Sequence, residues 1–315
     1  MTDTTLIIYA VLELFGMFAI GILARRLKLI NDEKTIQSLN KLVILILFPM
    51  LAFSTIIKTV KFENLKENAS LPLISILLIA IGTVGGLVLA KGLSKKDDTD
   101  LKRTFWHICS FNNFGFLPIV IIGSLSEENL AWLFIFNLGS VSLYWSMGIA
   151  QLGAKDLKSG LKKILSPNFI TIIVSVLIVC TGLSQYVPEI VIKITSKAGN
   201  ASIPLALIII GMTLYDVGLK LFNRDVVYYT FCRLIILPVI YIWILTFLPL
   251  NNLVLQIGLI VSLMPGALTP AVLTRLYGGS PEFASQTAVV STFFSLATIP
   301  IGFYILQYLG IWQGF

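Results

Sequence analysis

Hydrophobic residues in this chain gather into runs of about 20, which is the length that a transmembrane α-helix needs to cross the hydrocarbon core of a bilayer. Short polar segments separate the runs. The pattern predicts ten spans, at roughly 5–24, 39–57, 71–90, 105–124, 130–152, 168–187, 198–218, 227–248, 253–276 and 283–309. The first run lacks a preceding basic segment and a small-residue cleavage site, so we interpret it as a true span rather than a signal peptide. The sequence therefore predicts an all-α polytopic membrane protein.

Two of the predicted spans contain residues that interrupt a helix. One carries Asn112-Asn-Phe-Gly-Phe-Leu-Pro118, and the other carries Met264-Pro-Gly-Ala-Leu-Thr-Pro270. Proline removes a backbone N–H and clashes with the preceding turn, and a bilayer offers no water to satisfy the freed backbone groups. Two interrupted helices in corresponding halves of a membrane chain are a sequence indicator of a transporter's binding site.

Composition and charge support a membrane protein without a sizeable soluble domain. Hydrophobic residues make up 57% of the 315 residues, charged residues only 12%, and the mean hydropathy is +0.91. The net charge of +7 would suit a nucleic-acid partner, but Lys and Arg collect in cytoplasmic loops because they set the orientation of the spans. Eighteen of the 23 Lys and Arg residues belong to the set of alternate loops that begins after the first span. We therefore expect a multi-pass protein of the cell membrane with both termini extracytoplasmic and no nucleic-acid partner.

The chain offers little for metal or covalent chemistry. Cys109, Cys180 and Cys232 lie in apolar runs without metal-ligand spacing, so we expect no disulfide, no metal site and no cofactor. A single histidine provides no credible Ser–His–Asp set, and no Gly-rich phosphate loop follows a predicted strand. The sequence thus argues against an enzyme and against ATP-driven transport.

The two halves of the chain repeat. Pro49 and Pro204 interrupt otherwise apolar spans 155 residues apart, and Pro118 and Pro270 are 152 residues apart. Each predicted unit has five spans, and an odd number makes the second unit enter the membrane from the opposite side. We therefore predict a 5+5 inverted repeat, with the first copy at 1–152, a cytoplasmic linker at 153–166 and the second copy at 167–315.

Several stretches resemble those of a known family. They are Ala198-Gly-Asn-Ala-Ser-Ile-Pro-Leu-Ala-Leu-Ile-Ile-Ile-Gly-Met-Thr-Leu214, Met264-Pro-Gly-Ala267, Leu276-Tyr-Gly-Gly279, Ser291-Thr-Phe-Phe-Ser-Leu-Ala-Thr-Ile-Pro300, and Asn137 with Trp145 and Gly148. Over nearly its whole length the chain resembles the auxin efflux carrier family of membrane transport proteins, which includes plant auxin exporters and bacterial carriers for malate or malonate.

This resemblance implies a sodium/proton-antiporter-like fold in which the broken fourth and ninth spans cross. It also implies a scaffold of spans 1, 2, 6 and 7, a transport domain of spans 3–5 and 8–10, elevator-like motion and a homodimer. The stretch from Asn112 to Pro118 is one residue shorter than the family's form, so either Asn112 or Asn113 is a candidate for the family's asparagine role.

A broken helix exposes unpaired N–H groups and the positive end of a half-helix dipole, which can bind a carboxylate without a buried Lys or Arg. The candidate substrate-binding residues are Asn112, Asn113, Gly115, Pro118, Asn137, Pro265, Gly266, Thr269, Pro270, Ser291 and Thr292. The alternative is that their polar groups hydrogen-bond neighbouring helices as packing contacts.

Ionisable residues within spans are candidates for coupling transport to protons. Glu13 lies midway along the first span, His107 near the inner end of the fourth, and Arg233 about two turns inside the eighth. The alternatives are a scaffold contact for Glu13, an interfacial position for His107 and an Arg233 side chain that extends to the cytoplasmic surface.

The leading hypothesis is a secondary active or potential-driven transporter, a permease or efflux carrier. Its expected substrates are small organic anions such as malate, malonate or auxin-like carboxylates, moved by elevator-type alternating access. A cation/proton antiporter on the same fold and a non-transporting membrane receptor are the alternatives. The substrate, the direction of transport and its energy source stay open.

Overall fold

The computed structural model describes residues 3–95, 97–154, 163–216 and 223–315, and every regular element in these ranges is a helix. Seven helical stretches among them are long and apolar enough to cross a membrane: Thr5–Arg26, Glu33–Thr59, Phe62–Gly92, Glu127–Gln151, Glu189–Tyr215, Arg224–Thr246 and Pro281–Tyr308. The other three predicted spans coincide with the shorter apolar helices Phe116–Leu125, Pro167–Cys180 and Asn252–Ser262. The all-helical prediction is confirmed. Residues 155–162 of the predicted linker, positions 217–218 of the predicted seventh span and the basic residues Lys96 and Lys220 lie outside the described ranges.

The first half of the chain ends near residue 152. Its elements are α1 (Asp3–Arg26), α2 (Glu33–Leu42), η1 (Val43–Leu47), α3 (Phe48–Thr59), α4 (Phe62–Glu67), α5 (Leu71–Leu89), η2 (Ala90–Gly92), α6 (Thr99–Ser110), α7 (Phe116–Leu125), η3 (Glu127–Asn129), α8 (Leu130–Leu143), η4 (Tyr144–Gly148) and α9 (Ile149–Gln151).

The second half follows with five predicted spans of its own. Its elements are α11 (Pro167–Cys180), η5 (Leu183–Tyr186), α12 (Glu189–Asn200), α13 (Ser202–Asp216), α14 (Arg224–Phe231), η6 (Cys232–Ile236), α15 (Leu237–Thr246), α16 (Asn252–Ser262), α17 (Thr269–Tyr277) and α18 (Pro281–Tyr308).

Several predicted boundaries differ from those of the helices, and the largest differences in the second half of the chain have a local cause. The sixth span ends at Cys180 rather than 187, where Gly182 takes a left-handed conformation with φ of +72°. The seventh begins at Glu189 rather than 198, because α12 is amphipathic and its exposed Lys193–Glu189 ion pair, at 2.7 Å, broke the apolar run.

In two cases a π-helical turn directly precedes a helix that has a proline near its start. Pro49 and Pro238 each lie in the first turn of a helix, α3 and α15, and a π-helical turn, η1 or η6, comes directly before each helix. A π-turn shifts the hydrogen-bond register by one residue, which accommodates the missing proline N–H without ending the span. The same solution therefore recurs in both halves of the chain.

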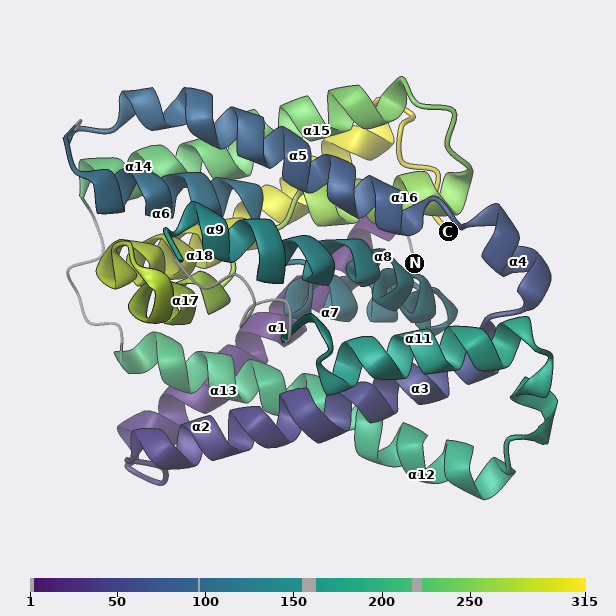
Figure 1. Cartoon of the computed structure of the whole chain (residues 1–315). Coiled ribbons are helices and arrows are strands. Elements are labelled where there is room, and N and C mark those ends of the chain that lie inside the picture. Colours follow the sequence, from purple (N-terminus) through teal and green to yellow (C-terminus); the bar gives the residue numbers. More distant parts are fainter. Residues whose placement is uncertain (1–2, 96, 155–162, 217–222) are drawn as a thin grey trace.

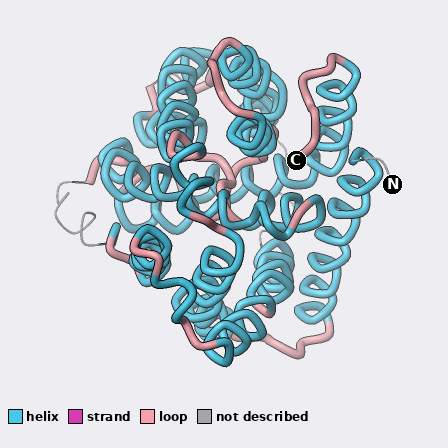
Figure 2. Tube along the Cα trace, turned by 90° about the vertical axis from the view of Figure 1, so that its right-hand side faces the viewer, coloured by secondary structure: helices cyan, strands magenta, loops and turns pink. Residues whose placement is uncertain are grey.

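The helices form two groups. In Figure 1, α2, α3, α11, α12 and α13 lie in the lower part of the view and α5, α6, α14, α15 and α16 in the upper part. The lower group includes α1, which packs on α13, and the upper group includes α8, α17 and α18. In the perpendicular view of Figure 2 many of the helices are seen nearly end-on. Both ends of the chain lie in the right half of Figure 1, toward α4.

Helix packing in one half recurs in the other. In the lower group α1 packs on α13 and α11 packs on α3, so the first predicted span of each half contacts the second predicted span of the other. In the upper group α5 packs on α6 and α8, just as α15 packs on α16 and α14 on α18. The two halves therefore interlock rather than lying side by side as separate domains.

Glycines allow α1 and α13 to approach closely. A Cβ atom on Gly21 would lie 2.0 Å from the Ile208 carbonyl oxygen, and one on Gly211 would lie 2.2 Å from the Phe18 carbonyl oxygen. Small residues at helix crossings let backbones come into van der Waals contact, which is a main source of helix association in membranes. This crossing depends on both glycines.

We expect Gly21→Val to lower the free energy of unfolding by about 1–3 kcal/mol, the usual cost of overfilling a packed contact. Thermal unfolding in a mild detergent measures it. Gly16→Val is the matched control, because a Cβ at Gly16 on the same helix meets nothing within 4 Å. Equal loss in both variants would contradict the assigned role of the crossing.

Candidate functional site

The two interrupted helices touch each other at their interruptions. The chain is non-helical between the end of α6 at Ser110 and the start of α7 at Phe116, and again between α16 and α17. Asn112 pairs with Gly266 in an antiparallel β-bridge, and the Asn113 N–H donates to the Pro265 carbonyl at 3.0 Å. The backbone groups freed by one break are thus partly satisfied by the other.

The carbonyl end of α16 is closed by side chains. The Asn112 amide nitrogen donates to the Val261 carbonyl at 2.7 Å. The Arg233 Nε donates to the Met264 carbonyl at 3.0 Å, and its Nη2 reaches the Ser262 carbonyl at 3.4 Å. A cation at a helix C-terminus also opposes the negative end of the helix dipole. The break in the ninth predicted span is therefore supported from the fourth and the eighth.

Arg233 is completely buried, with 0% of its surface exposed. Its Nη1 donates to the Tyr241 hydroxyl at 3.3 Å, and its guanidinium carbon lies 5.3 Å from the centroid of the Tyr241 ring. The interpretation that this side chain extends to the cytoplasmic surface is therefore wrong. Arg233 lies only two turns from the end of its predicted span, within reach of the surface, but its side chain instead donates hydrogen bonds to the carbonyls at the end of α16.

Tyr229 closes the carbonyl end of α6. Its hydroxyl donates to the Ile108 carbonyl at 3.1 Å, and its side chain is fully buried. Tyr229 and Arg233 are four residues apart on one face of the eighth span, so one helix face supports both breaks. Tyr229 is not among the site residues predicted from the sequence. The available signal was the i, i+4 spacing of a tyrosine and an arginine within an apolar run.

No side chain of the described residues caps the amino ends of α7 and α17, in contrast to the carbonyl ends. Pro118 and Pro270 lie buried in the first turns of these helices, where proline's missing N–H costs least. A Cβ at Gly115, directly before α7, would meet nothing within 4 Å, so there is free space beside the helix start. Backbone N–H groups at such ends bind anions.

The other predicted residues divide into two sets. Asn137 donates to the Phe114 carbonyl at 3.1 Å, and the Ser291 hydroxyl accepts from the Gly266 N–H at 3.1 Å, so both hold the breaks in shape. Thr292 is buried beside Ser291, whereas Thr269 is exposed. The packing alternative therefore accounts for the bonds that Asn137 and Ser291 make.

The two adjacent asparagines differ in what their side chains bind. Asn112 is occupied by the Val261 carbonyl, and its own amide oxygen is buried without a partner. The Asn113 side chain is 8% exposed and makes no hydrogen bond with any other residue that the structure describes. Asn113 thus retains a full set of amide donors and acceptors beside the crossing.

The remaining coupling candidates differ in their distance from the crossing, because His107 lies in the last turn of α6, directly before the break, whereas Glu13 lies on α1. Glu13 is on the exposed face of α1. His107 is fully buried, rather than at a water-contacting interface, and its ring lies 5.1 Å from Phe111 and 5.7 Å from Tyr144. Neither ring nitrogen of His107 has a hydrogen-bond partner within the described ranges, and neither does the Tyr144 hydroxyl. A coupling role for Glu13, His107 or Arg233 stays a prediction.

The crossing carries a positive charge. Two positive and two negative helix ends meet there, and their partial charges of roughly half an elementary charge each offset one another. Arg233 then leaves an excess of about one positive charge. Among the residues whose burial the structure describes, the buried carboxylate is that of Asp225, eight residues before Arg233 on the same span. It does not offset the Arg233 charge at the crossing, because it accepts hydrogen bonds from the N–H and the hydroxyl of Ser94. An anion therefore suits this site better than a cation.

Apolar helices of membrane-spanning length that are broken at a charged crossing define a helical membrane transport protein. A family model described as membrane transport protein matches the chain twice, over residues 6–158 and 155–303. The chain therefore belongs to this family, the auxin efflux carrier family, which comprises transporters and not enzymes. The two parts of the match fall one in each half of the chain and suggest an internal repeat.

Individual relatives are similar over nearly the whole chain. An uncharacterized transporter of Methanocaldococcus jannaschii is 28% identical over 313 residues, covering 96% of this chain and 98% of the relative. A second uncharacterized transporter, from Methanothermobacter thermautotrophicus, is 23% identical over 92% of this chain and 95% of its own. A protein of Rhizobium meliloti named "Putative malonate transporter" is 23% identical over 94% of this chain and 95% of its own.

Replacing the buried guanidinium tests its structural role. We expect Arg233→Gln to lower the free energy of unfolding by about 2–4 kcal/mol, because bonds from a charged donor to otherwise unpaired carbonyls are lost. Arg233→Lys keeps the charge without the planar guanidinium, so its free energy of unfolding should lie between those of the wild type and Arg233→Gln. Arg224→Gln, an exposed residue at the start of α14, is the control for charge alone. Thermal unfolding of Arg233→Gln that matched this control would contradict the assignment.

Glycine substitutions distinguish the tight part of the crossing from its open part. A Cβ at Gly266 would lie 2.8 Å from the Tyr229 hydroxyl, which is held by its bond to Ile108, and 3.2 Å from the Ser291 hydroxyl. We expect Gly266→Ala to cost about 1–3 kcal/mol in unfolding free energy. Gly115→Ala should unfold like the wild type, because a Cβ there meets nothing within 4 Å. A larger loss of unfolding free energy in Gly115→Ala than in Gly266→Ala would contradict the assignment of open space at Gly115.

Proposed function

We propose that this protein is a secondary transporter of small organic anions that bind at the crossing of the two broken helices. The observation that carries the proposal is a difference between the carbonyl ends of α6 and α16, which side chains cap, and the amino ends of α7 and α17, which they do not. Side chains of Asn112, Arg233 and Tyr229 occupy the carbonyl ends, whereas the amino ends of α7 and α17 are uncapped. A carboxylate is the group that such uncapped ends attract.

The charge of the crossing and one relative's name support a small carboxylate as substrate. The excess of about one positive charge would balance a monoanion, or about half the charge of a dicarboxylate. The Rhizobium meliloti relative is named for malonate. Malonate and malate are therefore the first substrates to test, with auxin-like monocarboxylates as the second class.

The proposed architecture is a 5+5 inverted repeat of ten spans, with repeats at 1–152 and 167–315 and both termini extracytoplasmic. The interlocked packing of the halves and the double family match support the repeat. The lower group of helices would form the scaffold, and the upper group would carry the crossing between the two sides of the membrane. A homodimer through the scaffold belongs to the same proposal.

A cation/proton antiporter has less support from the charges present. That chemistry uses a carboxylate beside the crossing, and the buried charge found there is the Arg233 guanidinium. A non-transporting receptor is separated from a carrier by measurement, because it would bind a carboxylate without moving it.

The two asparagines should respond differently to alanine. Asn113→Ala should unfold like the wild type but lose at least about tenfold in affinity for malonate, because its free amide is the proposed ligand contact. Asn112→Ala should lower stability by about 1–3 kcal/mol, because it removes a buried 2.7 Å hydrogen bond to the Val261 carbonyl and leaves that carbonyl only the longer bond from the Met264 N–H, at 3.2 Å. Stabilisation of the purified protein by a panel of carboxylates measures affinity, since a ligand that binds only the folded state raises the apparent stability.

Uptake into liposomes completes this test. Labelled malonate, malate and indole-acetate should enter vesicles that contain the wild-type protein, and the Asn113→Ala protein should carry its best substrate at least about tenfold more slowly. Equal uptake by the wild type and by the double variant Asn112→Ala/Asn113→Ala would overturn the site. Binding without uptake would favour the receptor, and sodium- or potassium-driven pH changes would favour the antiporter.

A further inference from the structure

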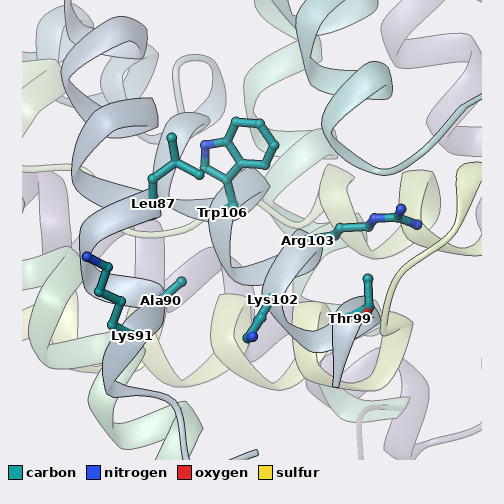
Figure 3. A pocket seen from close by; sticks show the side chains of 7 residues that line it. All are labelled: Leu87, Ala90, Lys91, Thr99, Lys102, Arg103 and Trp106. Atoms are coloured by element: carbon teal, nitrogen blue, oxygen red, sulfur yellow. The ribbon is translucent and has the colours of Figure 1, made fainter. Parts of the chain in front are cut away.

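A basic pocket lies away from the crossing, where the end of α5 meets the start of α6. Its volume is about 540 Å³. Figure 3 shows its two walls, with one wall from α5 and η2 and the other from α6. The lining residues are Leu87, Ala90, Lys91, Thr99, Lys102, Arg103 and Trp106. Three cations thus share one cavity at the ends of two predicted spans.

None of these cations has a carboxylate partner within the described ranges. Lys91, Lys102 and Arg103 are all exposed and form no ion pair with any residue that the structure describes. Arg103 lies at the edge, with Nη1 2.9 Å from the position of a Cβ on Gly153. In Figure 3 the three charged ends extend to different sides of the pocket, and an anion from outside the chain that lay between them would be attracted by all three.

The acidic residues nearby do not fill that role. Asp98 accepts a hydrogen bond from the Leu101 N–H at 2.9 Å and thereby caps α6. Asp225 is engaged by Ser94. Asp97 and Asp100 are exposed and do not line the pocket. The local carboxylates are therefore used elsewhere or point outside the cavity.

The walls of the pocket are fixed. The Tyr228 hydroxyl donates to the Leu89 carbonyl at 2.9 Å, and the bond of Ser94 to Asp225 anchors the loop that follows Lys91. On the other wall the Trp106 indole nitrogen donates to the Thr83 carbonyl at 3.0 Å. The backbone that carries the three cations is therefore already ordered without a ligand, which lowers the conformational-entropy cost of binding.

The pocket opens onto an apolar surface that is continuous along α5. Leu87 is 51% exposed, Val88 58%, Val84 63% and Leu73 65%. A small soluble anion would gain nothing from contact with this apolar surface, whereas an acyl chain would pack against it. A half-buried tryptophan beside the cations is also typical of the membrane–water boundary.

We propose that this pocket binds the headgroup of an anionic phospholipid, with its phosphate among Lys91, Lys102 and Arg103 and its acyl chains along the exposed face of α5. Basic pockets between transmembrane helices at the membrane surface bind such headgroups. The site belongs to the upper group of helices and is separate from the crossing. It does not depend on which substrate the protein carries.

Native mass spectrometry of the full-length protein in a neutral detergent tests the proposal without any transport measurement. The probes are dioctanoyl phosphatidylglycerol, dioctanoyl phosphatidylcholine and inorganic phosphate. We expect phosphatidylglycerol to bind more tightly than phosphatidylcholine. Its Kd should rise at least about tenfold when the three charges are removed, because each contributes about a fivefold effect near a membrane surface. The variant is Lys91→Gln/Lys102→Gln/Arg103→Gln.

Two further variants keep the result interpretable. Lys91→Arg/Lys102→Arg/Arg103→Lys retains the charge and should retain binding. Lys61→Gln/Lys66→Gln/Lys197→Gln removes equal charge elsewhere and should bind like the wild type. Equal binding of phosphatidylglycerol by the pocket variant and this control overturns the proposal, as does equal binding of the two lipids. Displacement of phosphatidylglycerol by inorganic phosphate at similar affinity would assign the pocket to a soluble anion instead.

Discussion

The structure depends on one constraint: a helix that stops inside a bilayer frees backbone carbonyls that no water can satisfy. In the ninth predicted span those carbonyls belong to Ser262 and Met264, and Arg233 donates to both. Asn112 adds a second donor to the Val261 carbonyl, which also accepts from the Met264 N–H. A buried guanidinium is expensive by itself, but the carbonyls and the negative helix end together provide what it needs. The break and the arginine therefore stabilise each other.

The two halves of the chain differ where they meet. Arg233 comes from the second half, and the residue 152 positions earlier is the apolar Ile81. Its neighbour Gly82 leaves room for the hydroxyl of Tyr241, since a Cβ there would lie only 2.6 Å away. One half of the chain thus provides the charge and its aromatic support, and the other half provides the space for the Tyr241 hydroxyl.

The breaks themselves were predictable because asparagine, glycine and proline in an apolar run have a local effect on the backbone. The burial of Arg233 was not, because it depends on carbonyls 29 and 31 residues further along the chain. The difference between Asn112 and Asn113 was equally hidden, since adjacent side chains diverge only once the break sets the backbone. The start of the seventh span was missed because the charges of α12 lie on its exposed face. Local patterns therefore predicted where the helices break, and long-range contacts decide what the breaks hold.

The distribution of contacts also bears on movement. Tyr229, Arg233, Asn137 and Ser291, which support the crossing, all belong to the upper group of helices. Where α7 meets the lower group the contact is apolar, as between Phe116 and Phe48, whose ring centroids are 5.3 Å apart. Apolar surfaces can slide without leaving a polar atom unpaired, whereas hydrogen bonds to freed carbonyls cannot be broken cheaply in a membrane. In the proposed carrier the crossing would therefore move as one body with its own supporting side chains, and the substrate would move with it.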